Sequence, residues 1–183
     1  MIEIDYPLRP SNFVNIGDEL TILRRIEATV TQDDHLNWDP ERTSRVRMVI
    51  LWSDERFTYE VRELTIEAPV DDFPVTGTLL RSVPVQMLLK LCINRALLTK
   101  QKGKALPLFQ SMHNAMGSDP EMLPRMAEKG PQPETLRWVA RLYTLAKIKL
   151  VPPAQYVSDA FEVPLRTASH WIKLARERGQ LTI

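Results

Sequence analysis

Residues 151–179 read VPPAQYVSDAFEVPLRTASHWIKLARERG. Apolar residues recur at helical spacing on both sides of a short gap: Val157 and Phe161 before it, and Ala168, Trp171, Ile172 and Ala175 after it. Ser158 and Ala168 are small and let two helix axes approach closely. Pro164 suits the first turn of a helix, where its missing N–H is not needed. The pattern predicts two short helices packed across a tight turn, a helix-turn-helix, with the second helix over about 164–178.

The turn itself contains Glu162 at a position that often carries glycine. Glycine is favoured there because a positive φ has no steric cost for it. Two alternatives follow: either Glu162 adopts the left-handed conformation with some strain, or the turn has a different geometry.

The side of the second helix that faces away from the apolar residues is polar and cationic. Between Pro164 and Gly179 it has four Lys or Arg residues and only one acidic residue, Glu177. Arginine pairs with guanine, Ser and His bond base edges, and leucine contacts a thymine methyl, whereas cations further along a helix suit phosphates. The residues expected to contact double-stranded DNA are Leu165, Arg166, Thr167, Ser169, His170, Lys173 and Arg176. The plain alternative is a solvated amphipathic helix.

This segment resembles the helix-turn-helix of many actinobacterial and actinophage proteins of the regulator type. In those proteins an alanine-rich helix runs into V-P-x-x-T-A-x-x-W-I-x-x-A-R-x-x-G. The matching positions here are Val163, Pro164, Thr167, Ala168, Trp171, Ile172, Ala175, Arg176 and Gly179, and the similarity extends upstream through residues 134–143, with a weaker patch at 75–85. The resemblance implies a DNA-binding regulator, but not what it regulates.

The N-terminal part predicts a small α+β domain. Two segments with period-two patterns lie on either side of a polar turn: one set, Val46, Met48, Ile50 and Trp52, alternates with Arg47, Val49 and Leu51, and residues 57–66 alternate between apolar and polar side chains. This arrangement indicates a β-hairpin. Residues 21–31 are rich in β-branched side chains and are expected to form a strand, although Leu20, Leu23, Arg24 and Glu27 would also suit a helical turn. Residues 1–20 and 68–84 are expected to be irregular. Residues 84–99 carry a helical apolar stripe that can cover the sheet.

We therefore expect an α+β fold with three parts: a small α+β domain over 1–104, a Pro- and Met-rich linker over 105–132 that leaves room for a short helix, and an all-α helix-turn-helix domain over 133–183. The N-terminal and C-terminal parts differ in net charge. Residues 1–83 have nine Lys and Arg against sixteen Asp and Glu, whereas residues 133–183 have eight against four. Nucleic acid would thus be attracted to the C-terminal part of the chain and repelled from the N-terminal part.

The sequence contains no residue pattern typical of an enzyme active site. The three histidines are scattered, and neither a phosphate-binding glycine loop nor a G-x-S-x-G motif occurs among 183 residues. We expect no catalytic residue, metal or cofactor. The single cysteine, Cys92, excludes an internal disulfide. The start of the chain lacks a signal-peptide pattern and no apolar run reaches membrane-spanning length, so we expect a cytoplasmic protein without a membrane partner.

Three functions remain open at this point. The first is sequence-specific DNA binding, as a transcriptional regulator, with the N-terminal domain forming a homodimer or binding a protein partner. The second is a non-catalytic interaction adaptor, in which Trp138, Trp171 and the Met-rich linker make the contacts. The third is DNA binding in phage packaging or plasmid partition.

Overall fold

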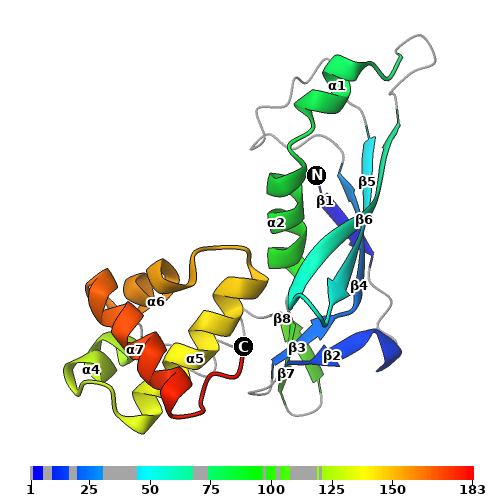
Figure 1. The fold of residues 1–183 in the computed structure, drawn as a ribbon. Helices are drawn as coiled ribbons and strands as arrows, with labels where there is room; N and C mark the ends of the chain where they lie inside the picture. Colours follow the sequence, from blue (N-terminus) through cyan, green and yellow to red (C-terminus); the bar gives the residue numbers. More distant parts are fainter. Residues whose placement is uncertain are drawn as a thin grey trace. The chain divides into compact units, whose positions relative to one another are not determined.

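The computed structural model describes residues 2–5, 10–16, 20–30, 45–67, 74–96, 98–101, 104–107, 119 and 121–183. The chain divides into two compact units, Met1–Pro107 and Leu108–Ile183, here the N-terminal unit and the C-terminal unit. The first contains antiparallel sheets with helices, and the second is helical in its described part (Figure 1). The predicted α+β class is confirmed.

The larger sheet of the N-terminal unit contains the predicted hairpin. Its strands are β1 (Ile2–Asp5), β4 (Arg25–Val30), β5 (Arg45–Ser53) and β6 (Thr58–Glu67), all antiparallel and in the order β1-β4-β5-β6. Val46, Met48, Ile50 and Trp52 of β5 are buried, and so is Val49, where the register with β6 shifts; Trp52 pairs with Tyr59 across the hairpin. The period-two pattern therefore predicted both strands and four buried residues of β5, but not the burial of Val49.

The smaller sheet consists of β2 (Phe13–Asn15), β3 (Leu20–Leu23), β7 (Leu98–Gln101) and β8 (Lys104–Pro107), in the order β2-β3-β7-β8. Only Arg24 separates β3 from β4, so one continuous stretch of chain bends from this sheet into the larger one. The predicted strand over 21–31 is thus two strands. The irregular structure expected for residues 1–20 is wrong where the chain is described, since β1, β2 and the short 3-10 helix η1 (Pro10–Asn12) lie there.

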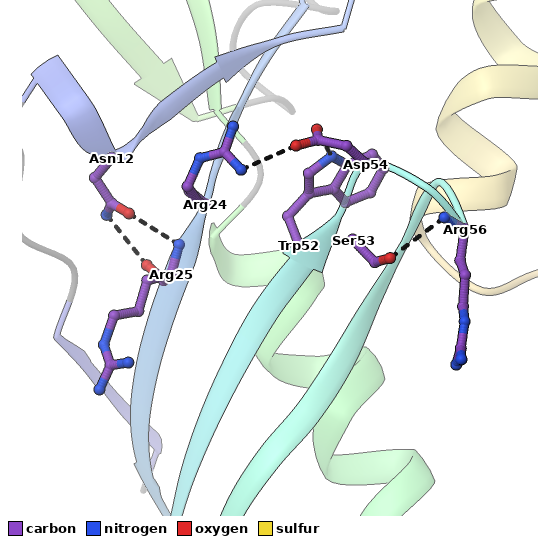
Figure 2. Close-up of polar contacts among 7 residues, drawn as sticks. All are labelled: Asn12, Arg24, Arg25, Trp52, Ser53, Asp54 and Arg56. Atoms are coloured by element: carbon purple, nitrogen blue, oxygen red, sulfur yellow. Dashed lines mark hydrogen bonds and ion pairs between the residues drawn. The ribbon is translucent and has the colours of Figure 1, made fainter.

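The bend at Arg24 is held by side chains from three parts of the unit (Figure 2). The buried amide of Asn12 donates to the Arg25 carbonyl at 3.1 Å and accepts from the Arg25 N–H at 2.8 Å. Asp54, at the end of the hairpin, accepts from Arg24 Nη1 at 3.0 Å and from Trp52 Nε1 at 2.9 Å. The bond from Arg24 is the main cause that lowers the pKa of the Asp54 carboxyl below its ordinary value of 3.8.

The described residues of the N-terminal unit also form two α-helices, and both depart from the prediction. Helix α2 (Val85–Ala96) buries Leu88, Leu89, Cys92 and Ile93 and contacts β1 and β4. The predicted helix over 84–99 ends earlier, at Ala96, because the chain enters β7 at Leu98. Helix α1 (Gly77–Ser82) lies within the predicted loop over 68–84, and its first turn is capped by Thr76 Oγ1, which accepts from Leu79 N at 3.2 Å.

Four helices form the described part of the C-terminal unit: α4 (Met122–Glu128), α5 (Pro133–Ile148), α6 (Pro153–Phe161) and α7 (Leu165–Glu177). Their core includes Leu123, Leu136, Val139, Val157, Phe161, Trp171 and Ile172. Because Leu123 belongs to this core, the described end of the predicted linker over 105–132 is a packed helix; residues 108–118 lie outside the described residues.

Each of the four described helices of this unit is followed, within two residues, by a residue in the left-handed conformation. Gly130 (φ 73°), Leu150 (φ 57°), Glu162 (φ 54°) and Gly179 (φ 70°) follow α4, α5, α6 and α7 in turn. This conformation lets backbone N–H groups beyond the helix bond its last carbonyls. Across the described ranges, no helix has the length and apolar character needed to cross a membrane.

Candidate nucleic-acid interface

The turn between α6 and α7 has a defined hydrogen-bond pattern. Glu162 adopts the left-handed conformation with φ 54° and ψ 39°, which decides between the two alternatives that the sequence left open. The N–H of Val163 donates to the Ser158 carbonyl at 3.1 Å, and the Ser158 hydroxyl donates to the Val163 carbonyl at 2.6 Å. These bonds close the end of α6 and fix the direction in which the chain enters α7.

Pro164 immediately precedes α7, whereas the sequence predicted it within the first turn of the helix. It is the residue that caps the helix, with φ −56°, and its carbonyl accepts from Ala168 N at 3.1 Å. The helix begins at Leu165 and ends at Glu177, within one residue of the expected range at each end.

The inner side of α7 is the predicted one. Ala168, Trp171, Ile172 and Ala175 are its buried residues. The Trp171 ring meets the Phe161 ring of α6 edge to face, with centroids 5.5 Å apart and planes at 88°. Such aromatic pairs contribute about 0.5–1.5 kcal/mol beyond the area they bury. Helix α7 also contacts α5, so its orientation is set by two neighbouring helices.

The outer side of α7 carries the predicted site residues. Leu165, Arg166, Ser169, His170, Lys173 and Arg176 are exposed, whereas Thr167 is half-buried. Leu165 is 48% exposed, and within residues 121–183 the only other large apolar side chain that is exposed to a similar degree is Ile183, at 38%. Because residues four apart share a helix face, Leu165 aligns with Ser169, and Arg166 aligns with His170.

The exposed side chains differ along the length of α7 in how they bond to the rest of the unit. Arg166, Ser169 and His170 make no side-chain hydrogen bond or ion pair to another described residue. Lys173 Nζ lies 3.7 Å from Glu177 Oε1, and Arg178 donates to the Pro131 carbonyl at 3.2 Å. The first half of α7 therefore presents uncommitted donors and acceptors, while Lys173 in its second half and Arg178 just beyond its end contact their own unit.

Arg176 has the most specific of these contacts. Its Nη2 donates to the Tyr143 hydroxyl of α5 at 2.6 Å, and its guanidinium lies 4.8 Å from the Tyr143 ring centroid. Tyr143 was not among the residues predicted from the sequence to form the site. The two residues are 33 positions apart, so no local spacing could have linked them.

Two further cations of the C-terminal unit lie against aromatic rings. The Arg141 guanidinium is 4.8 Å from the Trp138 ring centroid, and Lys149 Nζ is 5.1 Å from that of Tyr156. The rings hold these cations at the surface without neutralising their charge.

Within the described residues, no group of three His, Cys, Asp or Glu side chains is placed to hold a metal ion. The site thus consists of an amphipathic helix, positioned by two others, whose outer face carries unpaired polar side chains and cations. No family model, curated protein or solved structure matches this chain.

Proposed function

We propose that the protein binds double-stranded DNA sequence-specifically by placing the outer face of α7 in the major groove, and that it acts as a transcriptional regulator. The observation that carries this proposal is the state of Arg166, Ser169 and His170. All three are exposed on a well-packed helix, and none bonds to another described residue. Side chains in this state can form bonds with base edges without first breaking bonds within the protein.

The position of each side chain along α7 suggests its role. In helix-turn-helix proteins the N-terminal residues of the second helix contact base edges. We assign guanine recognition to Arg166, base-edge hydrogen bonds to Ser169 and His170, and contact with a thymine methyl to Leu165. Thr167, half-buried near the helix start, is assigned to a phosphate or to the helix backbone.

Lys173 and Arg176 lie further along the helix and are assigned to phosphates. The ion pair of Lys173 with Glu177 does not prevent this, because the two side chains are 75% and 54% exposed. An exposed i,i+4 pair is worth only about 0.3–0.5 kcal/mol, so a phosphate can replace Glu177 readily.

Charge supports the same proposal. Residues 133–183 have eight Lys and Arg against four Asp and Glu, and the structure describes all of them. A cationic helical unit attracts an anionic duplex and raises the rate of association. Since one small module touches few base pairs, we propose that two copies, joined through the N-terminal unit, bind two half-sites about one helical turn apart.

The experiment is a titration of a labelled random duplex pool with wild-type protein at about 50 and 200 mM salt, followed by selection of the bound sequences. We expect binding that weakens steeply with salt and a consensus with two-fold symmetry. The variant Arg62→Ala serves as a control for surface charge. It removes one exposed arginine from β6 in the N-terminal unit and should leave the binding unchanged. If the wild-type protein shows no salt-sensitive binding, the proposal is wrong.

A protein-interaction adaptor is the second candidate, and one observation favours it. Val75, Leu80 and Met87 are 43%, 53% and 40% exposed, on or beside α1 and α2. The contacts expected from sequence are less available, since Trp171 is buried and Trp138 is half-buried beneath Arg141. The titration separates the two candidates, because an adaptor would bind no duplex pool.

A further inference from the structure

The contact between Arg176 and Tyr143 joins two helices at the surface of the C-terminal unit. Arg176 lies in the last turn of α7, and Tyr143 is a half-buried residue of α5. The hydrogen bond of 2.6 Å and the distance of 4.8 Å from the guanidinium to the ring centroid hold the arginine from two directions. A long, exposed side chain is thereby restricted to one orientation before any ligand arrives.

The charge of Arg176 is restrained but not neutralised. Within the described residues, no carboxylate lies within ion-pair distance of its guanidinium, whereas Lys173 on the same helix has Glu177 at 3.7 Å. A guanidinium has five N–H donors in a planar fork, and Tyr143 accepts only one of them in this structure. The remaining donors have the geometry that binds phosphate in a bidentate manner.

The Tyr143 hydroxyl is a second donor at the same place. Because its oxygen accepts the bond from Arg176, its own hydrogen must point to a different acceptor. No described residue accepts a hydrogen bond from it. A hydroxyl donor beside an uncompensated guanidinium is complementary to a phosphodiester, whose charged oxygens accept from arginine and tyrosine side chains alike.

We propose that Arg176 and Tyr143 together bind one backbone phosphate of the DNA, forming a two-residue phosphodiester site that spans α7 and α5. This inference rests on the proposed function. Arg176 lies ten positions after Arg166, which is about 15 Å along the helix axis. A contact at that distance from the base-reading residues fixes the register of α7 in the groove.

The test is a scan of the selected duplex in which single phosphates are replaced by neutral methylphosphonates. Four full-length proteins are compared with wild type: Arg176→Ala, Tyr143→Phe, the double variant, and Tyr156→Phe. Tyr143→Phe keeps the ring and removes only the hydroxyl. Tyr156→Phe is the matched control, since it removes the hydroxyl of the other tyrosine that contacts a cation in this unit. Melting temperatures establish that each variant is folded.

We expect wild-type protein to bind several-fold more weakly when one particular phosphate of each half-site is neutral. Arg176→Ala and Tyr143→Phe should both lose sensitivity at that same phosphate, while Tyr156→Phe keeps it. Arg176→Ala should reduce the slope of log K against log salt by about one, whereas Tyr143→Phe, which keeps the charge, should not. In the Arg176→Ala background, Tyr143→Phe should have less effect than in wild type.

The site is overturned if the two variants lose sensitivity at different phosphates, if neither loses it, or if their effects on affinity are additive. These outcomes leave DNA binding itself intact. If wild-type protein binds no duplex at either salt concentration, the proposed function fails and the phosphodiester site fails with it, so the two failures are distinguishable.

Discussion

Ser158 and Val163 form two hydrogen bonds that hold the turn before α7. The hydroxyl of Ser158 donates to the Val163 carbonyl at 2.6 Å, and the Val163 N–H donates back to the Ser158 carbonyl at 3.1 Å. Ser158 is only 7% exposed, so its hydroxyl satisfies a carbonyl that would otherwise lack a partner in a nearly dry place. Any role for α7 depends on this pair, because it sets where the helix begins.

Ser158→Ala should therefore destabilise the C-terminal unit. Loss of the bond and an unsatisfied carbonyl together cost about 1–2 kcal/mol. The free energy of unfolding from urea denaturation measures this. Ser169→Ala is the control, since Ser169 is exposed and without a described partner, and its change should be close to zero. Equal effects of the two substitutions would contradict the role given to Ser158.

Glu162→Gly should stabilise the protein. Glu162 has φ 54°, a conformation that strains a residue with a side chain but costs glycine no steric strain. The gain should be about 0.5–1 kcal/mol, since the greater flexibility of glycine in the unfolded chain offsets part of the relief. Leu150→Gly, at φ 57°, should not gain as much, because Leu150 also loses partly buried apolar surface. Lower thermal stability of Glu162→Gly would show that the turn is not left-handed.

The two halves of α7 should respond differently to substitution. Arg166→Ala and His170→Ala should each cost about 1–3 kcal/mol of binding free energy at particular bases and relax specificity there. Lys173→Ala should weaken binding to all sequences alike and reduce the salt slope by about one. Dissociation constants on the selected site and on single-base variants give both quantities. A uniform loss for all three variants on every sequence would show that the division into base readers and phosphate contacts is wrong.

Leu165 should make the protein sensitive to a single methyl group. Its side chain is 48% exposed at the start of α7, where a thymine methyl can cover it. Replacing the contacted thymine by deoxyuridine removes only that methyl and should cost about 0.8 kcal/mol. Leu165→Ala should bind the thymine and deoxyuridine duplexes with nearly equal affinity. If wild-type protein shows no preference at any thymine of the site, Leu165 has no such contact.

Acid should weaken the N-terminal unit through Asp54. Because Arg24 and Trp52 donate to its carboxylate, the pKa of Asp54 is lowered in the folded state. A lowered pKa gives stability that is present above the unfolded-state value and is lost as the pH falls through the folded-state value. The stability difference between wild type and Asp54→Asn should thus shrink as the pH is lowered below about 4. A difference that stays constant with pH would rule out this linkage.

Local patterns in the sequence predicted those strands and helices whose buried residues recur at regular spacing within a single segment. Val46, Met48, Ile50 and Trp52 alternate within one strand, and Ala168, Trp171, Ile172 and Ala175 recur within one helix. Strand β7 has no comparable signal, since its pairing of Leu98 with Thr21 and of Thr99 with Leu20 joins segments far apart in the chain. Short strands of this kind take their structure from distant partners.

The linker prediction left room for a short helix, but the bounds and packing of helix α4 could not be predicted, for a different reason. Proline within residues 105–132 indicated a linker, yet Pro124 lies in the first turn of α4, where a missing N–H breaks no helical bond. The packing of α4 depends on Leu123, which lies in the core that three other helices also form. No local sequence pattern reveals this contact. The residues exposed on α7 were predictable because the burial of the opposite face dictates them, whereas the contact of Arg176 with Tyr143 arises from the packing of α7 on α5.

The most direct measurement is a map of backbone amide chemical-shift changes in the full-length protein on adding the selected duplex. We predict the largest changes at residues 165–176, together with Tyr143, and much smaller changes across β1 to β6 of the N-terminal unit. Changes that gather on the N-terminal unit, with α7 unaffected, would contradict the claim that the outer face of α7 binds DNA.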